Sequence, residues 1–129
     1  MNGVDTNVIV RFLTGDEPEQ SAKARAILKR PEVFVTDSVM LESEWVLRHA
    51  YGFQKSAIHE AFSKLCGLPN IILPNSRRMQ TALQWYAEGM DFADALHLAS
   101  SQGCQTFYSF DRKFLVKAEG RGQCKVKEP

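Results

Sequence analysis

The sequence lacks the features that would indicate a small metal-stabilised or membrane protein. It has no CxxC pair, and its three cysteines, Cys66, Cys104 and Cys124, are far apart and odd in number. A zinc knuckle therefore has no support, and we expect buried or unreactive thiols in a reducing compartment. No apolar run approaches the roughly 18 residues that a membrane-spanning helix needs. Asp5 stands where a signal peptide would be apolar, which predicts a cytoplasmic protein.

A strong charge of either sign is also missing. Sixteen Lys and Arg residues against fifteen Asp and Glu residues give a formal net charge of +1, which argues against a histone-like coating of nucleic acid. A local basic patch is still compatible with that balance. No repeat, low-complexity run or linker divides the 129 residues, so we expect one domain, 1–129. Ordinary fractions of hydrophobic (44%) and charged (24%) residues exclude a disordered chain, a collagen-like fibre and a coiled coil.

Short runs of β-forming residues alternate with amphipathic segments along the chain. The predicted strands are Val33–Val35, Ile71–Leu73, Thr106–Phe110 and a last short strand near 125–127. The predicted helices begin near Thr6 and span Glu19–Arg30, Val39–Tyr51, Lys55–Cys66, 76–88 and Asp91–Gln102. This alternation is typical of an α/β fold whose parallel sheet is covered on both faces. Such sheets bind ligands at the carboxyl ends of their strands.

Several acidic residues interrupt the apolar pattern at those strand ends. Asp5 follows the apolar start of the chain directly, and Asp111 follows the predicted strand Thr106–Phe110. Asp111 precedes a basic helix start, so an N-cap is its alternative role. Asp91 and Asp94 fall in the first turn of one predicted helix, where Asp91 is compatible equally with a cap and with a functional carboxylate.

Glu42 and Glu44 lie two residues apart in another predicted helix, so they point to different sides. The stripe through Val39 and Val46 passes Glu42, which predicts a carboxylate on the inward face. Glu44 is about 200° away on the helical wheel, and we expect it to be a solvated surface acid. Trp45 belongs to the same helix, and its aromatic side chain is expected in the core rather than as a base-stacking surface.

Together, these acids point to a metal-binding site. Unpaired carboxylates gathered in one place repel one another and need a cation. Because no Cys or His set offers softer ligands, an all-oxygen site suits Mg²⁺ or Mn²⁺. Metal-assisted hydrolysis of a phosphodiester is the chemistry that such a site performs well.

Four ordered blocks of the sequence resemble those of PIN domains, most closely the VapC-type toxins of bacterial toxin–antitoxin systems. The blocks are Val4–Val8, Leu41–Leu47, Asp91–His97 and Ser109–Asp111, and they cover almost the whole chain. The resemblance implies a three-layer α/β/α PIN-like fold with a central parallel sheet of four or five strands. It also implies a Mg²⁺- or Mn²⁺-dependent endoribonuclease that acts as a toxin, binds a small antitoxin protein and forms a homodimer.

The family's acidic residues carry over onto Asp5, Glu42, Asp94 and Asp111, with Asp91 as a frequent fifth. The resemblance implies that Asp5 and Asp94 hold the main ion directly, while Asp111 and Glu42 bind through water, hold a second ion or orient the attacking water. Supporting positions are Thr6, Asn7 and Ser109, the last standing where the family usually has threonine.

Basic residues after Asp111 are candidates for holding RNA phosphates. Arg112, Lys113 and Lys117 share helical spacing, although a solvated helix face explains them equally well. His97 follows Asp94 by three residues and could approach the site, although we expect it to be solvated or to face its helix.

Two other functions are compatible with parts of the sequence. A haloacid-dehalogenase-like phosphatase also begins with an aspartate after its first strand, but it needs a second acid at the position held here by Asn7. A non-catalytic RNA- or protein-binding PIN-like module has no need to concentrate mutually repelling carboxylates. The intact set of acids therefore favours the nuclease.

Overall fold

The computed structural model describes all 129 residues, which form two compact units, Met1–Ser76 and Arg77–Pro129. In the first unit, β1 (Asn2–Gly3) pairs in parallel with β2 (Val33–Phe34), and β2 pairs in parallel with β3 (Ile71–Ile72). The ladder places Gly3 opposite Phe34, so β1 and β2 end at the same edge of this three-stranded sheet. The segments that follow both strands therefore start their helices from one edge.

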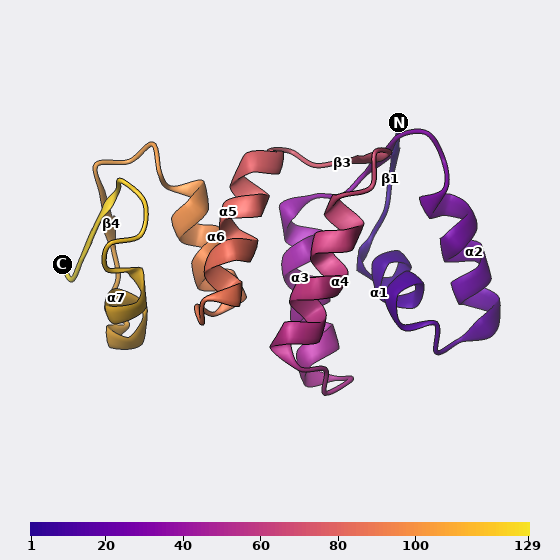
Figure 1. The fold of residues 1–129 in the computed structure, drawn as a ribbon, viewed down its shortest axis with the longest axis horizontal. Coiled ribbons are helices and arrows are strands. Elements are labelled where there is room, and N and C mark those ends of the chain that lie inside the picture. The colour runs from indigo at the N-terminus through magenta and orange to yellow at the C-terminus, as the bar shows by residue number, and fades with distance from the viewer. The chain divides into compact units, whose positions relative to one another are not determined.

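Four helices complete the first unit: α1 (Thr6–Thr14), α2 (Pro18–Leu28), α3 (Asp37–His49) and α4 (Lys55–Cys66). Helix α1 packs against α2 and α3, and α3 packs against α4 (Figure 1). The core beneath them is aliphatic and aromatic, with fully buried Ile9, Val33, Met40, Leu47 and Phe62. Burial of this apolar surface is what stabilises helices too short to persist alone in water.

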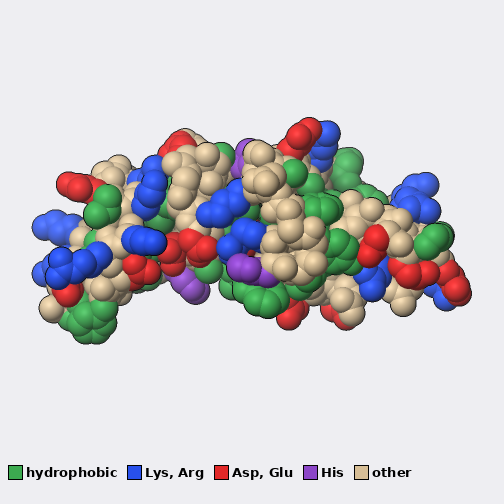
Figure 2. Space-filling model, turned by 90° about the horizontal axis from the view of Figure 1, so that it is seen from below, with side chains coloured by type: hydrophobic (Ala, Val, Ile, Leu, Met, Phe, Trp, Pro, Cys, Tyr) green, Lys and Arg blue, Asp and Glu red, His purple; other side chains and the backbone are tan.

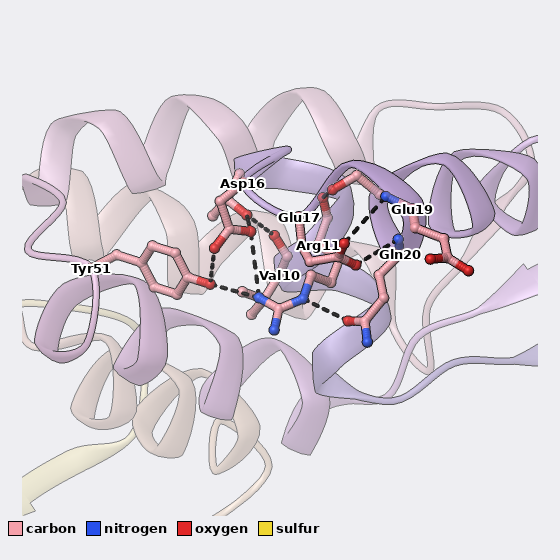
Figure 3. A network of polar contacts seen from close by, with 9 residues as sticks. Val10, Arg11, Asp16, Glu17, Glu19, Gln20 and Tyr51 are labelled. Carbon is pink, nitrogen blue, oxygen red and sulfur yellow. Dashed lines mark hydrogen bonds and ion pairs between the residues drawn. The ribbon is translucent and has the colours of Figure 1, made fainter.

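A polar network joins α1 and the α1–α2 turn to Tyr51, two residues after the end of α3 (Figure 3). The guanidinium of Arg11 donates to the Tyr51 hydroxyl at 2.7 Å, and that hydroxyl donates to Asp16 at 2.8 Å. Thr14 also donates to Asp16, and these hydrogen bonds from Thr14 and Tyr51 hold the pKa of the Asp16 carboxyl below its ordinary value. Gly15 adopts a φ of 64°, a left-handed conformation that glycine accepts without steric cost, and so ends α1.

The second unit contains α5 (Ser76–Ala87), α6 (Phe92–Ser100), β4 (Thr106–Tyr108), α7 (Arg112–Ala118) and β5 (Lys125–Lys127). Strands β4 and β5 pair in parallel as a separate two-stranded sheet. Tyr86 of α5 and Phe92 of α6 meet edge to face, with ring centroids 5.2 Å apart. Phe107 of β4 packs against Phe114 of α7, also at 5.2 Å. Aromatic contacts thus join α5 to α6 and β4 to α7 within this unit.

The bounds of the helices and strands agree with the sequence-based predictions more closely than the pairing of the strands does. The helix Lys55–Cys66 and the strand 125–127 have the predicted bounds, and the other helices agree within about three residues at each end. The α/β class is confirmed, and parallel pairs join three strands in the first unit and two in the second, while a central sheet of four or five strands stays a prediction. Apolar runs show which segments form strands, but they do not encode which strands pair.

The prediction that Trp45 lies in the core is wrong. Its side chain is 57% exposed, because α3 buries the stripe of Met40 and Leu47 instead. All three cysteines are free, and partial burial raises the pKa of the Cys66 thiol to about 11. No helix is long and apolar enough to cross a membrane.

Candidate metal-binding carboxylates

Asp5 lies directly between β1 and α1, where it caps the helix. Its backbone is extended, with φ −96° and ψ −179°, and its carboxylate accepts a hydrogen bond from the Val8 amide at 3.3 Å. The side chain is exposed, so one oxygen serves the cap while the group stays accessible. An α/β sheet binds ligands at the carboxyl ends of its strands, and the exposed carboxylate of Asp5 lies at such an end.

Thr6 and Glu42 connect the start of α1 to α3. The Thr6 hydroxyl donates a hydrogen bond to Oε1 of Glu42, although the two residues are 36 positions apart. Thr6 is buried, whereas Glu42 is exposed. Asn7 is exposed as well, and it lines a groove of about 310 Å³ with Arg11. Of the two supporting residues predicted here, Thr6 touches a predicted acid and Asn7 does not.

The prediction that Glu42 faces inward and that Glu44 faces solvent is wrong. Glu44 is only 2% exposed and forms a two-pronged ion pair with Arg48, with N···O distances of 2.7 and 3.2 Å. Glu42 lies on the exposed side, because α3 buries a stripe of polar and apolar residues together. The stripe includes Ser43 and Glu44, which a search for apolar residues alone passes over. The Glu-to-Arg spacing of four residues was the available signal for the buried pair.

Asp91 and Asp94 begin α6. Asp91 is the N-cap, and its carboxylate accepts from the Asp94 amide at 3.3 Å, so the cap alternative is confirmed. The pKa of the half-buried Asp94 carboxyl is raised, first by loss of solvent and then by the negative charges of Asp91 and Asp111. The nearby His97 acts in the opposite direction and lowers the pKa of Asp94. These effects place three acids within electrostatic reach of one another.

Asp111 caps α7 at the end of the segment that follows β4. Its Oδ1 accepts from the amides of Lys113 and Phe114, at 2.9 and 3.2 Å. Its own amide donates to the Ser109 hydroxyl at 3.0 Å, which fixes the turn between the strand and the helix. The predicted N-cap alternative is therefore confirmed for Asp111, and Ser109 supports its backbone rather than its carboxylate.

The predicted acids thus fall into two groups by unit. Asp5 and Glu42 belong to the first unit, and Asp91, Asp94 and Asp111 belong to the second. No three Asp, Glu, His or Cys side chains gather closely enough to form a coordination cluster. The donor chemistry nevertheless suits a hard divalent cation, because the groups are carboxylates and those around Asp94 repel one another.

The predicted phosphate-binding residues are accessible. Arg112, Lys113 and Lys117 are all exposed on α7. On the face shown in Figure 2, Lys and Arg side chains lie among Asp and Glu side chains.

A comparison with protein families decides the family. The sequence profile of the PIN domain matches residues 4–120. The chain belongs to the PIN domain family. The matched range includes all four sequence blocks that carried the resemblance, and it extends across both units of the PIN-domain chain.

Comparisons with individual proteins add less to the PIN assignment. No curated protein matches the chain. Among solved structures, it is similar to the Mycobacterium tuberculosis toxin VapC20, described as cleaving the sarcin–ricin loop. That likeness has 20% sequence identity and a TM-score of 0.45, and it covers 97% of this chain and 99% of VapC20.

Proposed function

We propose that this PIN-domain protein is a Mg²⁺- or Mn²⁺-dependent endoribonuclease. The observation that carries the proposal is the environment of Asp94, whose pKa is raised by burial and by its acidic neighbours Asp91 and Asp111. Helix capping accounts for Asp91 and Asp111 but not for Asp94, whose charge both of them repel, so a function that needs a cation explains its position. Membership in the PIN family favours a nuclease over the phosphatase alternative.

We propose roles for the five acids as follows. Asp5 and Asp94 hold the ion directly, and Asp91 adds negative charge beside Asp94. Asp111 and Glu42 act through water, and Thr6 holds the Glu42 carboxylate in place. A bound divalent ion supplies charge neutralisation at the scissile phosphate and lowers the pKa of an attacking water. Water, instead of the ribose 2′-hydroxyl, attacks the phosphorus, and the bond from phosphorus to the 3′-oxygen breaks, which leaves a 5′-phosphate on one product and a 3′-hydroxyl on the other.

The biological role that we propose is that of a toxin in a type II toxin–antitoxin pair. Under this proposal residues 1–129 are a single PIN-like domain, the protein forms a homodimer, and a small antitoxin protein restrains it. RNA is the substrate, and the exposed Arg112, Lys113 and Lys117 contribute phosphate contacts. A short open reading frame directly upstream of the gene would support the pairing.

The test is incubation of the purified protein with total RNA in Mg²⁺, in Mn²⁺ and in EDTA. We expect cleavage with either metal and none in EDTA, with 5′-phosphate at the new ends. Asp94→Asn is the negative control, because it removes the carboxylate that the proposal places on the metal. RNA binding without cleavage in any metal would favour the alternative, a non-catalytic PIN-like module.

A further inference from the structure

One face of the β4–β5 sheet carries aromatic and basic side chains together. In the parallel ladder Tyr108 lies opposite Lys127, and partner positions in adjacent strands project from the same face. Lys125 precedes Lys127 by two residues, so it lies on that face as well. The Lys127 ammonium sits 5.7 Å from the centre of the Tyr108 ring, close enough for a cation–π contact.

The opposite face of the same sheet is covered. Phe107 alternates with Tyr108 and packs against Phe114 of α7, with ring centroids 5.2 Å apart. Its ladder partner Val126 is half-buried, whereas both lysines beside it in β5 are exposed. Helix α7 therefore fills one side of the sheet, and the aromatic and basic side chains are on the other.

Phe110 extends the exposed aromatic surface toward Asp111. The Ser109 amide donates to the Lys127 carbonyl at 3.2 Å, so the extended pairing continues past the end of β4. Phe110 follows Tyr108 by two residues, the spacing of one face of an extended segment, and directly precedes Asp111. Phe110 is 76% exposed and Tyr108 is 56% exposed, a pair of aromatic rings left in water where a folded domain gains nothing from them.

The charges on this face suit a polyanion. Lys125 and Lys127 are exposed and form no ion pair with a carboxylate. The next residues after Phe110 are Asp111, which is occupied in capping α7, and the exposed Arg112. Aromatic rings that accept stacked bases, beside cations that neutralise phosphates, are the recurring components of single-strand binding surfaces.

We propose that Tyr108, Phe110, Lys125 and Lys127 form a platform for single-stranded RNA. Bases stack on the two rings, and the lysines contact the backbone phosphates. The inference rests on RNA being the substrate of the proposed nuclease, and it adds how the strand is held beside Asp111. The two lysines lie beyond residues 4–120, so the PIN-domain match does not account for this half of the platform.

The test measures RNA binding without cleavage. A fluorescein-labelled oligouridylate of about 12 nucleotides is titrated with the full chain in EDTA, and fluorescence anisotropy gives the Kd. We expect Phe110→Leu and Tyr108→Leu each to weaken binding by about fivefold or more, the range for loss of one base stack. Phe110→Tyr, which keeps a ring, should bind like the parent. Phe53→Leu is the matched control, because Phe53 is an exposed aromatic residue of the other unit.

Replacing a lysine should also change the salt dependence of RNA binding. Lys127→Gln should weaken binding and lower the slope of log K against log salt by about 0.7, the value for one phosphate contact on a single strand. Unchanged affinity and salt slope in all these variants would overturn the platform, even if the parent cleaves RNA. Loss of binding in the two Leu variants with no cleavage in Mn²⁺ would support the platform and contradict the nuclease. Altered self-association in light scattering, with RNA affinity intact, would reassign the face to protein contacts and overturn the proposal.

Discussion

The hydroxyl of Thr6 donates a hydrogen bond to the carboxylate of Glu42, which ties the first turn of α1 to the second turn of α3. The donor is buried and the acceptor is exposed, so the contact holds one carboxylate oxygen while the side chain remains open to solvent. It depends on β1 and β2 ending at one edge of their sheet. The buried Thr6 thus positions Glu42, which we propose to act in catalysis.

Thr6→Val should lower cleavage and leave the fold intact. Valine keeps the shape of threonine but cannot donate the hydrogen bond, and a bond to a charged group contributes about 1.5–3 kcal/mol. We expect about a tenfold or greater fall in kcat with little change in KM, and recovery in Thr6→Ser. Steady-state kinetics on a labelled RNA and a melting curve make the measurement. Equal losses in the Val and Ser variants would show that Glu42 does not need the hydroxyl.

Glu42→Gln and Glu44→Gln should fail in different ways. Glu42 is exposed, so its variant should lose cleavage and keep the parent stability. Glu44 is buried against Arg48, so losing its charge weakens charge-assisted hydrogen bonds worth about 1.5–3 kcal/mol of unfolding free energy. Urea unfolding and an RNA cleavage assay on both variants separate the two effects. A stable but inactive Glu44→Gln protein would contradict this division of roles.

Asp5→Asn should abolish cleavage without loss of stability. Asparagine caps helices as well as aspartate does, so the hydrogen bond from the Val8 amide is kept while the charge is lost. Asp5→Ala is the comparison, because it removes the cap as well and should cost about 1 kcal/mol of stability. Near-normal cleavage by the Asn variant would remove Asp5 from the proposed metal site.

Asp94→Asn should stabilise the metal-free protein at neutral pH. The folded-state pKa of Asp94 lies above its ordinary value of 3.8, so the folded parent loses stability as the pH rises through that folded pKa. The amide carries no charge at any pH. The variant should therefore melt higher than the parent at pH 7, and the difference should disappear below pH 3.8. A variant less stable at pH 7 would indicate a structural role.

Bound metal should make the parent protein more stable than the Asp94→Asn variant. An ion that binds only the folded protein stabilises it by about 2.7 kcal/mol at a hundred times its Kd. Mg²⁺ or Mn²⁺ should therefore raise the Tm of the parent by several degrees, Mn²⁺ at lower concentration, and EDTA should cancel the gain. Asp94→Asn should lose most of it. No shift with either ion at millimolar concentration would contradict the proposed metal site.

Tyr51→Phe should lower the melting temperature in a pH-dependent way. The variant loses the hydrogen bonds to Asp16 and Arg11 shown in Figure 3, and we expect a fall of about 2–6 °C at pH 7. The lowered pKa of Asp16 means that its contribution is present above the ordinary value of 3.8 and is lost as the pH falls through the folded-state pKa. Tyr108→Phe is the control, since it keeps an exposed ring. Equal falls in the two variants would contradict the network.

The local elements could be predicted from the sequence because their signals are local. Glycine and proline bound the helices, and residue type and position offered the cap role for Asp91 and Asp111. The order β1–β2–β3 within the first unit could not be predicted, because two-residue strands such as β2 carry no information about their partners. Pairing depends on contacts between segments that are distant in the chain.

The sequence pointed to candidate acids but not to the surroundings in which the structure places them. Acids at strand ends pointed to Asp5 and Asp111, and the spacing of Asp91 and Asp94 placed both in one helical turn. The sequence pattern predicted an inward-facing Glu42 and a solvated Glu44, whereas Glu42 is exposed and Glu44 is buried. Helix α3 buries an ion pair and a serine, so its inner face is not marked by hydrophobicity. Burial of a paired charge cannot be inferred from periodicity of apolar residues alone.

Three of the proposed acids, Asp5, Asp91 and Asp111, are also helix N-caps. Aspartate and asparagine codons differ by one transition, and asparagine serves equally well in the capping role. If these acids carry the proposed activity, inactive variants that still fold are thus a single nucleotide away at each position. Where the activity burdens the cell, selection for survivors should return these changes among soluble, full-length proteins instead of truncations. The geometry that begins the helices thereby leaves an evolutionary route by which the chain could persist as a stable, non-cleaving binding protein.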